Sequence, residues 1–188
     1  SSRKLFSIRM EPNTIETAIQ RMRTPSGIRE MYHLAQLLEE PTEQGNIFPE
    51  HFVITSILNN LDLIKDAKEE LNEYQHYLYR LLRRLTEKKQ DLIAFSEALL
   101  TSKIKTTRQF AATEILLLDS SRKELKPAVR SALRNHPLAN TRLDAARAII
   151  EAHPNSEDVS VLIQALEDTD FQVRHEITHV LTLSLIHI

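Results

Sequence analysis

The sequence predicts an all-α protein, and three observations lead to that prediction. Only two of the 188 residues are glycine, whereas β-hairpins and tight turns depend on glycine. Apolar residues recur at helical spacing, and no stretch alternates apolar and polar residues for long enough to form a strand. Prolines and helix-capping residues divide the chain into segments of ordinary helical length. The shortage of glycine also excludes a glycine-rich phosphate-binding loop.

The helix boundaries follow from these signals. Pro12 opens the first helix, a proline–glycine break over 24–27 separates it from the second, and the second ends near Pro41, before a polar loop over 41–47. Ser121 and Glu124 have the spacing of a capping box. The further predicted helices cover residues 48–61, 64–86 (unusually long), 88–101, 105–118, 122–134, 139–152, 157–167 and 171–182.

Composition excludes several classes of protein. The chain has no cysteine, so disulfides, thiolate metal sites and a cysteine nucleophile are excluded, which suits a reducing compartment. No apolar run approaches the ~18 residues of a membrane span, and no signal peptide is visible. We therefore expect a cytoplasmic chain without a cofactor, whose parent protein could still be membrane-attached.

Both ends of the sequence look non-native. The chain begins with Ser1, and residues 183–188 read Leu-Ser-Leu-Ile-His-Ile. These six residues are what a transposon-end adapter used in DNA library preparation encodes. We therefore expect a fragment of a longer protein with a non-native tail over 183–188.

Self-comparison reveals an internal repeat in the C-terminal half. Arg108, Arg142 and Arg174 are 34 and 32 residues apart, and each begins an apolar, alanine- or isoleucine-containing helix. A shorter apolar helix and a turn precede the last two of them. The residues that carry the pattern are Arg108–Ile115, Leu125–Val129, Arg142–Ile149, Asp158–Leu166, the turn 168–170 and Val173–Ile177. Such helix pairs bury their apolar faces only by stacking on one another.

This pattern resembles the HEAT repeat and its bacterial HEAT-like variants: a helix, a short acidic turn, Val-Arg, and a second helix. The resemblance is good over 121–182, fair over 88–120 and weak over 12–86. It implies an α-solenoid, a right-handed superhelix of about five antiparallel helix pairs. The implied organisation is a divergent helical region over 1–86, which contains the long 64–86 helix, followed by HEAT-like repeats over 87–182.

The repeated positions are interpreted as structural. Each arginine is expected to pair with the acidic turn of its own or of a neighbouring repeat. Alanines at 111, 112, 145 and 146 would permit close helix approach. The residues assigned to this structural class are Arg108, Arg142, Arg174, Pro127 and Asp170.

One motif resembles a metal site. His175-Glu176-Ile177-Thr178-His179 has the H-E-x-x-H spacing of zinc metalloproteases, in which two histidines on one helix face bind zinc and the glutamate activates water. The third ligand is missing, because Thr182 and Leu185 stand where the metzincin extension has glycine and histidine. The same residues also suit a repeat helix that buries Val173 and Ile177, so we interpret the match as fortuitous.

The charges are unevenly distributed. Residues 78–135 contain 13 Lys and Arg against 6 Asp and Glu, although the whole chain has a net charge of −2. The block could bind an anionic partner, but solvated helix faces explain it better, and dedicated nucleic-acid binding is not expected. The residues of a candidate binding surface are Arg80, Arg83, Arg84, Lys88, Arg122, Lys126 and Arg130, together with Gln109, Asn140 and Gln172 on the concave face of the repeats.

The sequence thus indicates a non-catalytic scaffold that binds another protein or another domain of its own chain. Two alternatives follow from weaker resemblances. Residues 108–129 are similar to the cytoplasmic HEAT region of transporter-like proteins with an ATP/ADP-translocase-like membrane domain. Some HEAT-like proteins are bilin lyases, for which a deep apolar groove would be expected.

Overall fold

The computed structural model describes residues 12–44, 51–65 and 73–186, and every regular element in these ranges is a helix. The chain divides into two compact units, residues 1–98 and 99–188. The boundary between the units lies within the helix Lys89–Leu100, whereas the boundary expected from the sequence, between 86 and 87, lies before it. None of the described helices combines the length and the apolar character that a membrane crossing requires.

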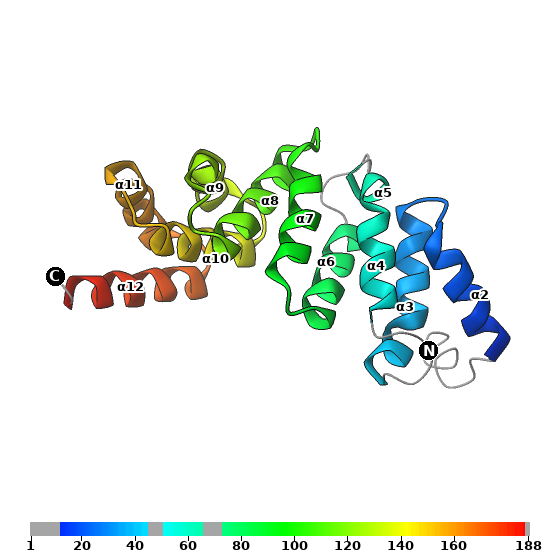
Figure 1. Ribbon diagram of the computed structural model, residues 1–188. Coiled ribbons are helices and arrows are strands. Elements are labelled where there is room, and N and C mark those ends of the chain that lie inside the picture. Colours follow the sequence, from blue (N-terminus) through cyan, green and yellow to red (C-terminus); the bar gives the residue numbers. More distant parts are fainter. Residues whose placement is uncertain (1–11, 45–50, 66–72, 187–188) are drawn as a thin grey trace. The chain divides into compact units, whose positions relative to one another are not determined.

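Unit 1, residues 1–98, packs its helices around a core of methionine, leucine, isoleucine and phenylalanine (Figure 1). The helix α3 contacts α2, α4 and α6. Met31, Ala35 and Leu38 are fully buried at spacings of four and three residues, which is the apolar stripe of an amphipathic helix. The helices are α2 (Pro12–Arg23), α3 (Ile28–Gln44), α4 (Phe52–Asn59), α5 (Leu61–Lys65), α6 (Glu73–Leu85) and α7 (Lys89–Leu100).

In unit 2, residues 99–188, the shorter helices α9 and α11 alternate with the longer helices α8, α10 and α12. The helices α8, α9 and α10 pack on one another, α11 packs on α9, and α12 packs on α10. The elements are α8 (Lys105–Leu118), the 3-10 turn η1 (Lys123–Leu125), α9 (Lys126–Asn135), α10 (Ala139–Glu151), α11 (Ser156–Gln164), the 3-10 turn η2 (Ala165–Glu167) and α12 (Phe171–Ile186).

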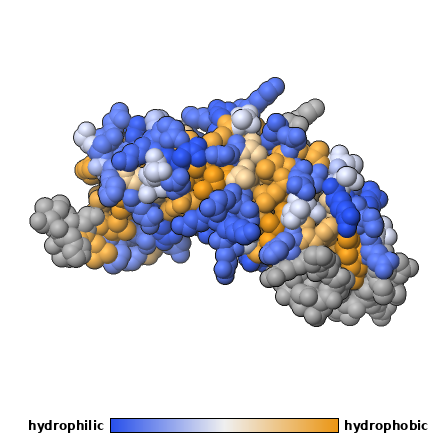
Figure 2. Space-filling model, viewed as in Figure 1, coloured by the Kyte–Doolittle hydropathy of each residue, from blue (hydrophilic) through white to orange (hydrophobic). Residues whose placement is uncertain are grey.

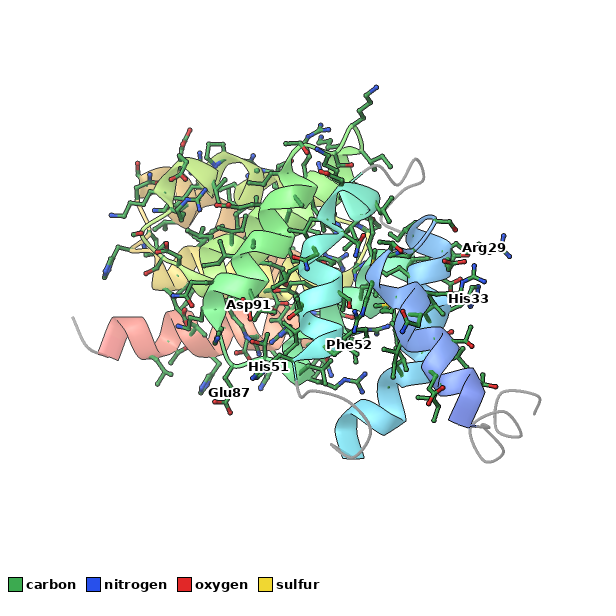
Figure 3. The ribbon with its side chains drawn as sticks, turned by 45° about the vertical axis from the view of Figure 1, so that its right-hand side comes forward. Arg29, His33, His51, Phe52, Glu87 and Asp91 are labelled. Carbon is green, nitrogen blue, oxygen red and sulfur yellow. The ribbon has the colours of Figure 1, made fainter. Side chains whose placement is uncertain are left out.

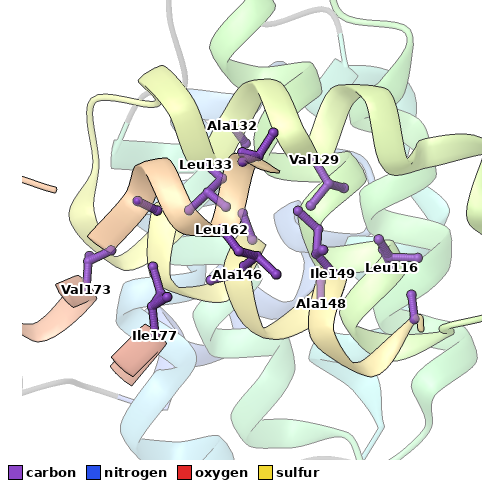
Figure 4. Close-up of a cluster of buried hydrophobic side chains, with 14 of the residues drawn as sticks. Leu116, Val129, Ala132, Leu133, Ala146, Ala148, Ile149, Leu162, Val173 and Ile177 are labelled. Carbon is purple, nitrogen blue, oxygen red and sulfur yellow. The ribbon is translucent and has the colours of Figure 1, made fainter. Parts of the chain in front are cut away.

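The core of unit 2 is rich in alanine (Figure 4). Ala111, Ala112, Ala145 and Ala146 are all fully buried, as the sequence predicts for helices that approach closely. Longer side chains from α9, α11 and α12, among them Val129, Leu162 and Ile177, fill the space between the helices. A methyl side chain has no rotamers with which to fill a wider gap. The buried alanines of α10 therefore require the neighbouring helices to lie close to it.

Two helix boundaries in unit 1 differ from the prediction. The helix α3 continues past Pro41 to Gln44, so the predicted end near Pro41 is wrong, and residues 45–47 of the predicted loop lie outside the described residues. The predicted 64–86 helix is wrong as a single element. The Gln75 side-chain Nε2 donates to the Ile64 carbonyl over 2.9 Å, whereas eleven residues of one helix would separate their backbones by about 16 Å.

The predicted capping box at the start of the 122–134 helix is also wrong. Ser121 donates its hydroxyl proton to Asp119 Oδ1 over 2.6 Å, and Glu124 accepts from Arg122 Nε over 2.6 Å. A 3-10 turn occupies 123–125, and α9 begins at Lys126 with Pro127 in its first turn, where a missing N–H is harmless. A real capping box lies at the start of α11, between Asn155 and Asp158.

Candidate binding surface

The three repeated arginines make the same hydrogen bond. In each case Nη1 donates to the backbone carbonyl of the residue six positions earlier: Arg108 to Ser102 over 2.8 Å, Arg142 to His136 over 2.8 Å, and Arg174 to Asp168 over 2.6 Å. This bond ties each long helix to the turn before it. All three arginines donate to a turn carbonyl, and Arg142 donates to an acidic side chain as well.

The turn residue at the same position also has a recurring role. Its side chain accepts the backbone N–H two residues later: Ser102 Oγ from Ile104 over 3.1 Å, His136 Nδ1 from Leu138 over 3.1 Å, and Asp168 Oδ1 from Asp170 over 2.8 Å. Three chemically different side chains thus accept the same backbone hydrogen bond. Because their identities differ, comparison of residue types does not align them, and only their place six residues before each arginine would have revealed them.

Arg142 makes an additional contact to the next turn along the chain. Its Nε and Nη2 atoms donate to the two carboxylate oxygens of Asp168 over 2.9 and 3.1 Å, and both side chains are largely buried. Burial raises the pKa of Asp168, but the hydrogen bonds from Arg142 and from the Asp170 backbone outweigh it, so the net pKa is lowered. Asp170 in turn accepts the N–H groups of Gln172 and Val173, which caps α12.

A buried charge cluster joins α9 to α11. Asp158 is fully buried and accepts from Lys126 Nζ over 2.7 Å and from Arg130 Nη1 over 2.8 Å. The Lys126 ammonium also donates to the His153 carbonyl over 3.1 Å, and Asp158 accepts the Asn155 N–H over 3.0 Å. Burial raises the pKa of Asp158, but its hydrogen bonds with Lys126, Asn155 and Arg130 together lower it further than burial raises it. The carboxylate is therefore ionised inside the unit.

This cluster changes the interpretation of the predicted basic surface. Lys126 is buried and Arg130 nearly so, because both neutralise Asp158, so neither can hold an anionic partner. Arg122 pairs with Glu124 in the same unit. The remaining predicted residues, Arg80, Arg83, Arg84 and Lys88, are exposed in unit 1, where Arg84 pairs with Glu39. The two stripes therefore belong to different units.

The predicted polar face of the second helices needs one correction. Gln109 is only 3% exposed, and its Nε2 donates to Ser131 Oγ over 2.8 Å and to Asn135 Oδ1 over 3.0 Å, so it is a packing residue. Asn140 and Gln172 are both exposed at the start of α10 and α12. They are 32 residues apart, as are Arg142 and Arg174, whereas Gln109 is not at the matching position in α8, which is occupied by Thr106.

The H-E-x-x-H residues lie on α12, where His175 and Glu176 contact neighbouring side chains. Val173 and Ile177 are buried and both histidines are exposed, as predicted for a repeat helix. Glu176 accepts from Arg147 Nη2 over 3.2 Å, and His175 stacks on Phe171 with ring centroids 5.8 Å apart. Within the described ranges no group of three histidine, aspartate or glutamate side chains could hold a metal ion. The geometry therefore gives these residues packing and surface roles.

Unit 1 has a groove of its own between α2 and α3, with a volume of about 820 Å³. Ala18, Leu34 and Leu37 form its apolar part, and Arg21 pairs with Glu30 at its rim. Arg29 and His33 project from α3 beside it (Figure 3). The groove is open and its lining mixes apolar side chains with threonine, arginine and histidine, so it does not point to a particular ligand.

Comparison with protein-family models, curated protein sequences and solved structures finds no match to this chain.

The buried turn residue His136 predicts a pH dependence of stability. Burial lowers the pKa of His136, its hydrogen bonds with Thr106 and Leu138 raise it, nearby Arg142 lowers it, and the net pKa is lowered. Because the unfolded chain binds a proton at about pH 6.5 and the folded chain resists it, His136 makes the free energy of unfolding fall as the pH drops from 7 to 5, by at most about 1.4 kcal/mol per pH unit.

Urea denaturation at pH 7 and pH 5 checks this expectation. His136→Ser, which copies the serine of the equivalent turn at Ser102, should lose less stability between the two pH values than the unaltered chain. His179→Ser, at an exposed position of the same unit, should leave the pH dependence unchanged. An identical pH dependence in the unaltered chain and in His136→Ser would show that another group is responsible.

Proposed function

We propose that this chain is a non-catalytic scaffold of HEAT-like helix pairs, stacked as an α-solenoid, that binds another protein or another domain of its own polypeptide. The observation that carries the proposal is the bond from Nη1 of Arg108, Arg142 and Arg174 to the carbonyl six residues earlier, repeated every 32–34 residues. A geometry that recurs at this interval is typical of repeat proteins, whose usual role is to present an extended surface.

The polar side chains of unit 2 support the same proposal. The buried ones are committed to packing, as in the Asp158 cluster, while Asn140 and Gln172 recur at the same exposed position of successive long helices. A surface that repeats with the structural unit is what a scaffold offers to an extended partner. A cytoplasmic location suits a chain without cysteine.

Site-specific photocrosslinking tests this proposal. A photoreactive phenylalanine analogue would replace Asn140 or Gln172 in the full chain, which is then illuminated in an extract of the organism that encodes it. We expect discrete adducts with the same protein from both positions, identified by mass spectrometry. The matched control is Ser160, an exposed residue on a short helix of the same unit. Equal adducts from all three positions, or none, would contradict the proposal.

A further inference from the structure

The long helices α8, α10 and α12 present equivalent faces, and the described residues of this face are exposed in α12. Positions 112, 146 and 178 are equivalent, because each lies four residues after a repeated arginine. Ala112 and Ala146 are fully buried, whereas Thr178 is exposed. Four residues further on, Leu116 is fully buried, Ile150 is half-buried and Thr182 is exposed. The face of α12 thus corresponds to surfaces that a neighbouring helix covers in α8 and α10.

The face of α10 that contacts α12 carries two arginines, and each of them binds a carboxylate. Arg142 holds the Asp168 carboxylate through Nε and Nη2, and Arg147 holds Glu176 over 3.2 Å. The two carboxylates are eight residues apart, one in the turn and one in the first turns of the helix that follows. The face of α10 is basic and the segment that covers it is acidic, so the two surfaces are complementary in charge.

The α12 face repeats this arrangement. Arg174 uses Nη1 for its own turn, as Arg142 does, and among the described residues its Nε–Nη2 edge has no carboxylate partner. His179 stands where Arg147 stands in α10, and it is exposed. The same surface that resembles a zinc motif in the sequence is therefore the equivalent of a carboxylate-binding surface one unit earlier.

The rest of the α12 face is suited to close helix packing. The hydroxyls of Thr178 and Thr182 donate to carbonyls of their own helix over 2.8 and 2.7 Å, so their methyl groups remain for an apolar contact. Phe171 is 68% exposed and lies below the Arg174 guanidinium, 5.9 Å from ring centroid to Cζ. Figure 2 shows apolar surface beside the C-terminal end of this helix, whereas hydrophilic side chains dominate over α9 and α11.

We propose that the α12 face, formed by Phe171, Arg174, Thr178, His179 and Thr182, is a docking surface for an acidic helical segment of a protein partner. Such a segment carries one carboxylate in a turn, seated on the Nε–Nη2 edge of Arg174, and a second eight residues later beside His179. This inference deepens the proposed scaffold function, on which it rests, by naming the surface and the chemistry of what it binds.

An extended chain tests the docking surface directly. Residues 183–188 would be replaced by a copy of residues 151–182, so that the added helix pair carries copies of Asp168 and Glu176 at the spacing already seen across α10 and α12. We expect the thermal midpoint of unit 2 to rise by about 5 °C, a shift that corresponds to roughly 1 kcal/mol for a unit of this size.

Substitutions then separate docking from a local role. Thr178→Glu should abolish the rise in the extended chain while leaving the midpoint of the original chain unchanged, and Ser160→Glu, also exposed, should affect neither. In the extended chain, Arg174→Lys and the Asp-to-Asn change at the copied equivalent of Asp168 should each lower the thermal midpoint. Their combined effect should differ from the sum of the two single effects. An extended chain with no higher midpoint, or an additive loss, would overturn the docking surface. The photocrosslinking result at positions 140 and 172 would be unaffected, so the two proposals fail separately.

Discussion

Replacing Asp158 with alanine is expected to cost unit 2 about 3–5 kcal/mol of unfolding free energy, because it leaves the buried Lys126 ammonium without its counter-ion. It also removes one of the two carboxylates that Arg130 contacts, the other being Glu157. The Lys126 and Arg130 side chains are 7% and 12% exposed, so water cannot replace the carboxylate. The substitution also removes the capping box at the start of α11. Urea denaturation followed by circular dichroism measures the loss.

Glu124→Ala is the matched control for this experiment. Glu124 also pairs with an arginine of unit 2, Arg122, but its side chain is 60% exposed, so we expect a loss of stability far smaller than that of Asp158→Ala. A loss for Asp158→Ala no larger than that of the control would show that the cluster is hydrated in solution. Since the pKa of Asp158 is lowered, its contribution is fully present above about pH 4 and is lost as the pH falls below that value.

The three repeated arginines are expected to differ in a defined order when each is replaced by alanine. Arg142→Ala should cost about 3–5 kcal/mol, because it also strands the Asp168 carboxylate, of which 8% is exposed. Arg108→Ala and Arg174→Ala remove the bond to a turn carbonyl and should cost about 1.5–3 kcal/mol each. Equal losses at all three positions would mean that the contact between Arg142 and Asp168 contributes nothing.

These three substitutions are controls for one another. They share one local geometry and one side chain, and they differ in the residue that faces the Nε–Nη2 edge. Thermal and urea denaturation of the three variants under identical conditions therefore isolates the contribution of the carboxylate. A double-mutant cycle with Asp168→Asn measures the same coupling independently.

The sequence predicts the limits of α8 and α10 closely, whereas it misplaces the start of α9. The 105–118 helix is observed as Lys105–Leu118, and 139–152 as Ala139–Glu151. In unit 1 two predicted limits fail. The Gln75–Ile64 hydrogen bond shows two helices where an unbroken run of helix-forming residues predicts one, and α3 continues past a proline that local rules would place at its end.

The candidate surface was harder to predict than the helices. The spacing of Lys126 and Arg130 identifies a basic stripe, but it cannot show that Asp158, on another helix, lies against it. Gln109 was misplaced because polarity alone does not distinguish an exposed amide from one that donates to Ser131 and Asn135. In both cases the sequence does not show which helices are neighbours. The repeat interval indicates the neighbours once equivalent helices have been matched to one another.

The hydrogen bond from each arginine to its turn has a consequence for how the chain tolerates insertions and deletions. The turn and its arginine are always six residues apart, whereas the distance from an arginine to the next turn is 28 residues from Arg108 to His136 and 26 from Arg142 to Asp168. One residue added between Asp168 and Arg174 would rotate the guanidinium by about 100° away from its carbonyl. Length can therefore vary around the loops that precede α9 and α11, while the six-residue link must be inherited intact.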